Sequence, residues 1–301
     1  MTGAPPPGGA PPRPPDWAAL DRRLDAVPGT VSAYVGRLDA PPAWVRHPDA
    51  THYAASTMKI AVLAALHRAA DPDRAPATAP LDLDAPVPVV NDFASARPGA
   101  PRFTCARTFD NDDAVWARLG DRAPLRWLAE RMIVRSSNLA TNIVLAHVGL
   151  PAVGRVWASA GARHSVTGRG IEDFAAREAG TTNLVTAADL AALLDALATG
   201  ATRPGPLATP TACAAMLDVL AAQEHREDLA AGLPDGTRIA HKSGWVRGVR
   251  HGAGVVYPTD APPYLVVVCT TVDPAAGRDV DACALVAEVS AAAWAARHHL
   301  P

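Results

Sequence analysis

The sequence contains no long hydrophobic run, no large excess of charge of either sign and no closely spaced cysteines. No uninterrupted apolar stretch approaches the ~20 residues that a membrane-spanning helix requires. A formal net charge of −2 over 301 residues gives no basic field for nucleic acid. We therefore expect neither a membrane nor a nucleic acid as a partner. With 49% hydrophobic residues, the chain can form one large domain or two closely packed subdomains.

The residues also give little support to metal or disulfide chemistry. The four cysteines lack the C-x-x-C spacing of zinc sites, and without a signal peptide they favour free thiols over disulfides. These cysteines are Cys105, Cys213, Cys269 and Cys283. None of the ten histidines stands in an H-x-x-x-H or H-E-x-x-H arrangement, so we expect no metal and no other cofactor.

Residues 1–15 are rich in Gly, Ala and Pro and lack the apolar region of a signal peptide. We expect a disordered tail there and a folded domain over residues 16–301. For the chain as written, the absence of a signal peptide predicts a cytoplasmic location. A translation start further upstream would instead allow secretion.

Strand patterns cluster at the two ends of the chain, and helical patterns lie between them. The expected strands are 31–38, 43–45, 237–242, 253–257 and 265–271. The expected helices are 16–27, 55–70, 125–135, 139–148, 152–160, 186–198, 212–223 and 280–298. Residues 71–113, rich in Pro and Asp, predict a long irregular excursion. This order favours an α/β (α+β) fold in which both chain ends share one antiparallel sheet with flanking helices, and an all-helical subdomain is inserted.

Three short motifs follow one another along the chain, and together they indicate a chemistry. They are S-x-x-K at Ser56 to Lys59, S-x-N at Ser136 to Asn138, and K-[ST]-G at Lys242 to Gly244. A serine hydroxyl is a weak nucleophile unless a base takes its proton, and a lysine one helical turn away can be that base. Each motif alone occurs by chance in many chains of this size, whereas the ordered triple is far more specific.

With these motifs the chain resembles the serine β-lactamase and penicillin-binding transpeptidase superfamily, specifically its class A β-lactamase branch. The resemblance covers residues 17–298 and includes the residues around the second motif, from Met132 to Asn142. It implies a catalytic domain over residues 16–301. In that domain, residues 16–54 and 224–301 would form the sheet subdomain and residues 55–223 the helical subdomain.

The resemblance also implies roles for the first two motifs. Ser56 would be the nucleophile that forms an acyl-enzyme with an amide or ester carbonyl, and Lys59 its base or proton relay. Ser136 would pass the proton to the leaving nitrogen, and Asn138 would contact the substrate amide. The plainer alternatives are a solvent-facing Ser and Lys on an ordinary helix and a simple helix cap.

The third motif would complete the site by the same resemblance. Lys242 would set its electrostatics and help to keep Lys59 neutral through like-charge repulsion. Ser243 and Gly244 would lie along the strand edge where substrate docks, with Gly244 leaving room for a close backbone approach. The N–H groups of Ser56 and Trp245 would form the oxyanion hole.

An arginine in the next strand would bind a substrate carboxylate, because the guanidinium fork matches a carboxylate. Arg250 is the expected residue, Arg247 is a nearby competitor, and a surface charge without a role is the alternative for each.

Hydrolysis of an acyl-enzyme needs a second base, which the class A family supplies as a Glu in an E-x-x-L-N setting on an Ω-loop. This chain does not contain that motif. Glu172 nevertheless lies 172 − 136 = 36 residues after Ser136, about where the base of the family would be expected. Glu172 is therefore the candidate. The alternative is that Asp173 or Glu178 forms a loop ion pair with Arg169.

A second departure is Ser137, where β-lactamases usually carry Asp. We expect a monomeric serine hydrolase acting on a small molecule, with β-lactams as the default substrate class. The alternatives are an esterase, amidase or transacylase of specialised metabolism, and a penicillin-binding domain that acylates without turnover.

Overall fold

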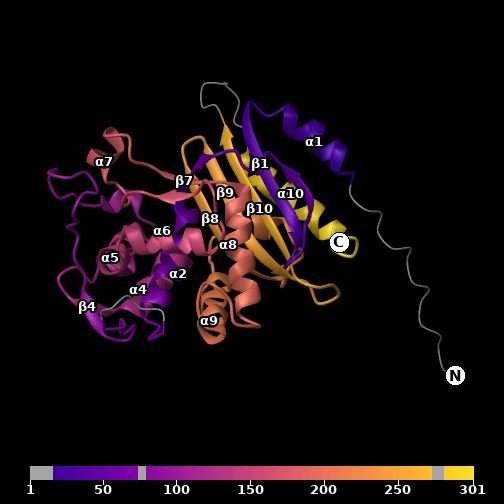
Figure 1. Cartoon of the computed structure of the whole chain (residues 1–301). Helices are drawn as coiled ribbons and strands as arrows, with labels where there is room; N and C mark the ends of the chain where they lie inside the picture. Colours follow the sequence, from indigo (N-terminus) through magenta and orange to yellow (C-terminus); the bar gives the residue numbers. More distant parts are fainter. Residues whose placement is uncertain (1–15, 74–78, 273–280) are drawn as a thin grey trace.

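The computed structural model describes residues 16–73, 79–272 and 281–301 and shows an α+β fold (Figure 1). The predicted fold class is confirmed. The tail expected over residues 1–15 lies outside the described residues.

Five antiparallel strands form the main sheet, in the order β2-β1-β10-β9-β8. Their bounds are β1 (Gly29–Arg37), β2 (Pro42–Arg46), β8 (Arg238–Val246), β9 (Val249–Tyr257) and β10 (Tyr264–Val272). Strands from both chain ends thus share one sheet, as predicted. The order leaves β8 as an edge strand, and β8 carries the third motif.

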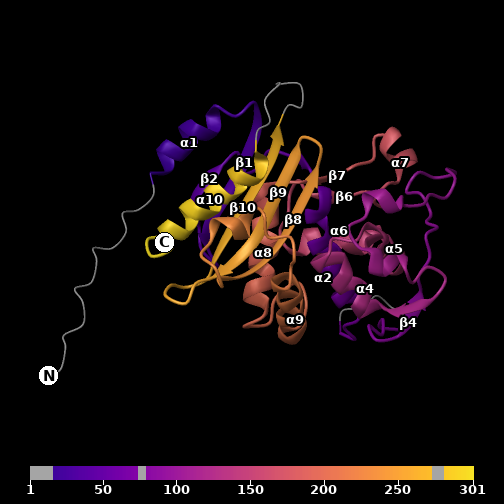
Figure 2. The ribbon, with the colours of Figure 1, turned by 180° about the vertical axis from the view of Figure 1, so that it is seen from behind.

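Helices cover both faces of the sheet. Successive side chains of a strand point to opposite sides, and in this sheet both sets are apolar and need a covering layer. On β10, Leu265 and Val267 pack in the same core as α8 (Ala187–Gly200). Val266 and Val268 pack in the other core, with α1 (Trp17–Asp25) and α10 (Ala282–Ala296). Figure 1 shows α8 in front of the sheet, and Figure 2, from behind, shows α10 in front of it. The helix α8 therefore packs on the sheet although it falls within residues 55–223.

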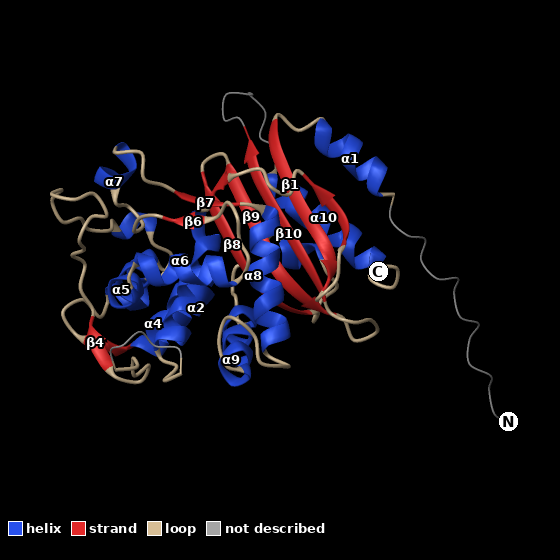
Figure 3. Cartoon of the chain, in the orientation of Figure 1, coloured by secondary structure: helices blue, strands red, loops and turns tan. Residues whose placement is uncertain are grey.

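The other large helices form a second body beside the sheet (Figure 3). They are α2 (Lys59–Ala69), α4 (Leu125–Val134), α5 (Asn138–Val148) and α6 (Leu150–Ser159), while α9 (Pro210–Ala221) contacts the edge strand β8 and α8 as well as α4. Residues 59–66 of α2 are all buried, as expected of a helix that is apolar on every side. The 3₁₀ helix η1 (Ala55–Met58) leads directly into α2.

Short elements fill the connections. The small strands are β3 (His52–Tyr53), β4 (Pro86–Pro88), β5 (Arg122–Pro124), β6 (Val166–Thr167) and β7 (Asn183–Val185). The short helices are η2 (Arg107–Phe109), α3 (Asp113–Trp116), α7 (Phe174–Glu178) and η3 (Leu229–Gly232). All four cysteines are free thiols. Within the described residues no single helix is long and apolar enough to cross a membrane, and the consecutive pair α5 and α6, which together pass that test, is bent by 88°.

Gly244 brings the sheet against the start of α2. A Cβ at this position would lie 2.9 Å from the backbone N of Ser56 and 3.0 Å from that of Thr57. Real Cβ atoms almost never come that close to backbone, so only glycine fits without a shift. The close backbone approach that we expected at Gly244 is thus the contact between β8 and η1.

Candidate active site

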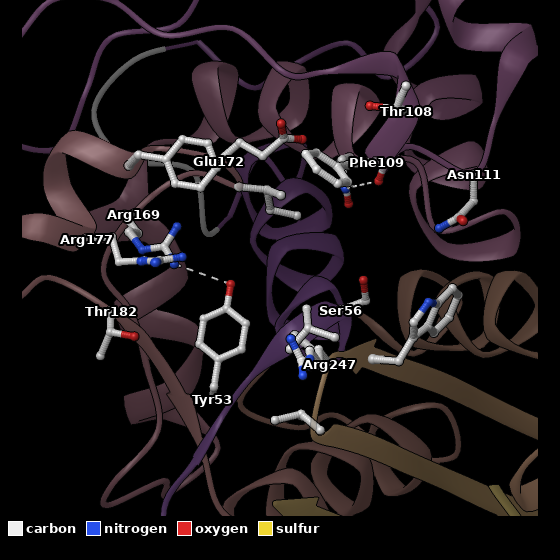
Figure 4. A pocket seen from close by; sticks show the side chains of 17 residues that line it. Tyr53, Ser56, Thr108, Phe109, Asn111, Arg169, Glu172, Arg177, Thr182 and Arg247 are labelled. Carbon is white, nitrogen blue, oxygen red and sulfur yellow. Dashed lines mark hydrogen bonds between the residues drawn. The ribbon is translucent and has the colours of Figure 1, made fainter. Parts of the chain in front are cut away.

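Ser56 lies on the wall of a pocket of about 720 Å³ between the sheet edge and the helical body (Figure 4). Three other expected site residues share this wall: Asn138, Glu172 and Trp245. Four other expected site residues from the motifs are fully buried: Lys59, Ser136, Lys242 and Ser243. The structure thus gathers the three motifs at one place.

One hydrogen-bonded network joins the first two motifs. The Ser136 hydroxyl donates to Ser56 Oγ at 3.0 Å, and Lys59 Nζ donates to Ser136 Oγ at 3.3 Å. Lys59 Nζ also donates to the Ser136 carbonyl at 2.7 Å and to Asn138 Oδ1 at 3.0 Å. The connection between Ser56 and Lys59 in this network therefore runs through the hydroxyl of Ser136.

Backbone strain is concentrated at this pocket. Ala55, Ser136 and Glu172 have φ values of 45°, 59° and 67°, in the left-handed region that non-glycine residues rarely occupy. They are three of the five non-glycine residues with positive φ in the described chain. Strained backbone persists where the surrounding structure enforces it, which is common at functional sites. At Ser136 this conformation accompanies a carbonyl bonded to Lys59 and a hydroxyl bonded to Ser56.

Burial lowers the pKa of Lys59 to about 7, while the nearby negative charge of Asp110 acts in the opposite direction. A full charge is costly to bury in the protein interior, so the neutral amine is favoured. A substantial fraction of Lys59 is then neutral at neutral pH and can accept a proton.

Lys242 is also fully buried, and its Nζ donates to the Ser243 carbonyl at 3.0 Å. Its pKa is lowered well below the usual value, first by burial and then by the positive charge of Lys59. Burial is thus the main reason why Lys59 is easily neutralised. The like-charge repulsion that we expected acts most clearly on Lys242.

Asp110 lies at the N-terminus of α5 and was not among the candidates from sequence. The Ser137 hydroxyl caps this helix by accepting from the N–H of Ala140 at 3.1 Å, and it donates to Asp110 Oδ2 at 3.2 Å. The same carboxylate oxygen accepts from the N–H of Leu139 at 2.8 Å. Ser137 occupies the position where β-lactamases usually carry an Asp. The carboxylate of Asp110, from the 107–113 segment, lies beside it and takes the place of that missing carboxylate.

Glu172 faces the pocket from the segment before α7. Its Oε2 accepts from the N–H of Ala106 at 2.9 Å, whereas its buried Oε1 has no hydrogen-bond partner among the described residues. Burial raises the pKa of this carboxyl, the Ala106 bond lowers it, and the charge of Asp110 raises it further. Asn142 on α5 fixes the neighbouring residue, since it bonds both the N–H and the carbonyl of Ile171 at 2.8 Å.

The alternative ion pair of Arg169 is not formed in the part of the chain that the structure describes. Its guanidinium donates to the Gly170 carbonyl at 3.1 Å and to the Tyr53 hydroxyl at 3.3 Å. Asp173 instead caps α7 and accepts from Ser95 Oγ at 2.7 Å.

Arg250 lies on β9 opposite Trp245 but is not on the pocket wall. Its Nη2 is 2.9 Å from Glu227 Oε1 and 3.1 Å from Asp228 Oδ2, and its guanidinium lies 5.1 Å from the Trp245 ring centroid. The competitor Arg247, in the turn between β8 and β9, is exposed and lines the pocket. The expected contact between Arg250 and a substrate is therefore not supported by its placement.

A model of the β-lactamase enzyme family matches residues 17–296. The chain belongs to the β-lactamase enzyme family. The superfamily predicted from the three motifs is thereby confirmed. The curated proteins include none that matches the chain.

Solved structures of similar proteins cover nearly the whole chain. A β-lactamase from Sphaerobacter thermophilus is 27% identical, with a TM-score of 0.74 over 95% of this chain and 99% of that one. A point mutant of PBP-A, solved as an acyl-enzyme complex with penicillin G, is 23% identical, with a TM-score of 0.70 over 96% and 98%. An ancestral class A β-lactamase, GNCA, is 22% identical, with a TM-score of 0.71 over 93% and 98%. At 23% and 22% identity, the last two similarities show only that the fold is shared.

Proposed function

We propose that this member of the β-lactamase family is a class A-type serine hydrolase that opens β-lactams through an acyl-enzyme on Ser56. The observation that carries the proposal is the network from Ser56 through Ser136 to the buried Lys59, which opens onto a pocket that also holds Glu172. Acylation requires a nucleophile and a base, here Ser56 and Lys59 with a pKa of about 7. Hydrolysis of the acyl-enzyme requires a second base, here the carboxylate of Glu172.

Acylation would start with neutral Lys59 drawing the proton of Ser56 through the hydroxyl of Ser136. The Ser56 oxygen then bonds to the lactam carbonyl carbon, and the ring C–N bond breaks as Ser136 delivers a proton to the nitrogen. The oxyanion would be bound by the N–H groups of Ser56 and Trp245. Gly244 supports this arrangement, because it lets the backbone of β8 approach the N–H of Ser56.

Deacylation would use Glu172 to activate a water molecule. Its place on the wall shared with Ser56 supports this role, as does a pKa raised by burial toward the range of an effective base.

Arg247 would bind the substrate carboxylate that Arg250 was first expected to hold. Arg247 lines the pocket without an ion pair in the described part of the chain, whereas Arg250 is already paired with Glu227 and Asp228.

A penicillin-binding domain that acylates without turnover is the second candidate. It is favoured by the bond from Ala106 to Glu172 Oε2, which takes one of the two carboxylate oxygens. An esterase, amidase or transacylase would use the same Ser56 network on a different carbonyl.

Turnover of a chromogenic cephalosporin tests the proposal, with Ser56→Ala as the control. Catalytic colour development that is lost in Ser56→Ala would support the lactamase. One equivalent of colour per protein would identify the non-hydrolysing binder. Labelling of Ser56 by a fluorophosphonate without any reaction with the cephalosporin would move the assignment to the esterase or transacylase.

A further inference from the structure

Arg169 is a buried cation on the pocket wall that has no acidic partner among the described residues. The residue is 2% exposed, yet its side chain lines the same pocket as Ser56. Its two hydrogen bonds go to the Gly170 carbonyl and the Tyr53 hydroxyl, and its buried Nε has no partner. A guanidinium carries five N–H donors, so more than half of its capacity is unused.

Two partly buried arginines of this protein are neutralised by acids, whereas the partly buried Arg37 bonds only the backbone carbonyls of Pro262 and Arg297. Arg131 forms an ion pair with Asp112 at 2.5 Å, and Arg250 lies against two carboxylates. Buried charges are ordinarily paired, because removing an ion from water is costly. Arg169 is more deeply buried than Arg131 and Arg250, yet it has no acidic partner among the described residues and lies on the wall of the pocket that holds Ser56, which points to a ligand as the missing partner.

The backbone around Arg169 is held in place by hydrogen bonds and close packing, so the fold itself positions this side chain at the pocket. Asn183 accepts from the N–H of Arg169 at 3.1 Å and donates to its carbonyl at 3.1 Å. At Gly170 a Cβ would lie 2.8 Å from Phe103 and 3.0 Å from Asn142, which fixes the close packing of the next residue.

A second guanidinium lies on the same side of the pocket. Figure 4 shows Arg169, Arg177, Tyr53 and Thr182 grouped there, while Ser56 and Arg247 lie toward the sheet edge. Arg177 is exposed and lies 5.7 Å from the Phe174 ring centroid, with no ion pair among the described residues. Glu172 is the only acid on the pocket wall that the structure describes, against three arginines.

We propose that Arg169 and Arg177, with the hydroxyls of Tyr53 and Thr182, form a second anion subsite that binds a carboxylate on the acyl side chain of the substrate. The inference rests on the proposed acylation at Ser56 and names its substrate class. Preferred substrates carry two anionic groups, one near Arg247 and one at the far end of the acyl chain. A carboxylate fits because it accepts two N–H bonds from one guanidinium.

Two penicillins that differ only at the end of the acyl chain test the subsite. One ends in a carboxylate and the other in the corresponding primary amide, and intact mass spectrometry gives the second-order rate constant for adduct formation with each. We expect the wild type to favour the carboxylate by about tenfold, the effect of one charge-assisted bond pair. The preference should fall toward one in Arg177→Gln and in Arg169→Lys, and it should weaken with salt.

Arg155→Gln is the matched control, because Arg155 is exposed on α6 and away from the pocket wall. This variant should keep the wild-type preference. Arg169→Lys retains the positive charge but not the fork, and thermal melting shows whether it is folded. A preference that is equal in the wild type, Arg177→Gln and Arg169→Lys would overturn the subsite.

If neither penicillin forms an adduct, the acylation proposal fails while the subsite is still tested. Calorimetric titration with glutarate then measures carboxylate binding directly. Binding that weakens about tenfold in Arg177→Gln, but not in Arg155→Gln, supports the subsite. Binding that is absent from the wild type or equal in all variants rejects it.

Discussion

Ser136 takes part in the site through both its backbone and its side chain. Its carbonyl accepts from Lys59 Nζ at 2.7 Å, and its hydroxyl connects Lys59 to Ser56. The carbonyl bond helps to hold the lysine in place, whereas the hydroxyl offers the path for a proton. These two contributions can be separated by a substitution that removes only the hydroxyl.

Ser136→Ala should slow acylation of Ser56 by about 10²–10⁴-fold, the usual range for loss of a positioned proton-transfer group. The fold should be retained, because the carbonyl bond to Lys59 does not depend on the side chain. Mass-spectrometric labelling rates with a penicillin, beside thermal melting, measure the two effects. Labelling at the wild-type rate would show that the proton does not travel through Ser136.

The pKa of Lys59 predicts how acylation depends on pH. Below about 7 the amine is protonated and cannot act as a base, so the acylation rate should fall about tenfold per pH unit there. The rate should level off above that pH. A pre-steady-state profile that is flat from pH 5 to 8 would contradict the role of Lys59.

The same pKa predicts a stability change with pH. Folded Lys59 releases its proton above about 7, whereas an unfolded lysine holds its proton up to the ordinary value of 10.5. Between these values the unfolded chain binds more protons, so the free energy of unfolding should rise with pH relative to Lys59→Met. Denaturant titrations of both proteins at pH 7 and pH 9.5 measure the difference, and a parallel pH dependence would contradict the expectation.

At the scale of elements, the N-terminus of α5 depends on a carboxylate from a distant segment. Asp110 accepts from Leu139 N–H and Ser137 Oγ, and it acts on the pKa of both Lys59 and Glu172. The positive end of a helix dipole and its unpaired N–H groups explain why a carboxylate is stabilising there.

Asp110→Asn should lower stability by about 0.5–2 kcal/mol, as for loss of a cap. It should also move the acylation profile to lower pH, because the charge of Asp110 raises the pKa of Lys59. The control is Asp113→Asn, since Asp113 is exposed and paired with the exposed Arg107. Equal effects of the two substitutions on the pH profile would remove Asp110 from the electrostatics of the site.

The elements themselves were largely predictable, because they are encoded in local periodicity and capping. The strands at both ends and the helices between them lie within a few residues of their expected bounds. The partners of site residues were not predictable in this way. Asp110 meets Ser137 across 27 residues, and Arg250 meets Glu227 across 23, so only the folded chain brings these charges together.

At the scale of the whole molecule, the site exists because the sheet edge meets the helical body at Gly244. Gly244→Ala should force β8 and η1 apart, since the new methyl group would lie 2.9 Å from Ser56 N. We expect a loss of about 1–3 kcal/mol of stability and slower acylation, measured by melting and by labelling. Gly154→Ala on α6 is the control, because nothing lies within 4 Å of its Cβ, and it should be neutral or stabilising. Unchanged acylation in Gly244→Ala would contradict the close approach.

In the proposed reaction Ser56 is acylated, and Glu172 then activates the water that releases the product. The most direct measurement is an intact-mass time course, with peptide mapping, of the wild type and Glu172→Gln after mixing with a chromogenic cephalosporin. We predict a transient adduct in the wild type and a stoichiometric adduct on Ser56 that persists in Glu172→Gln, because only the second step needs the carboxylate. No adduct on Ser56 in either protein, or equal turnover in both, would contradict the account.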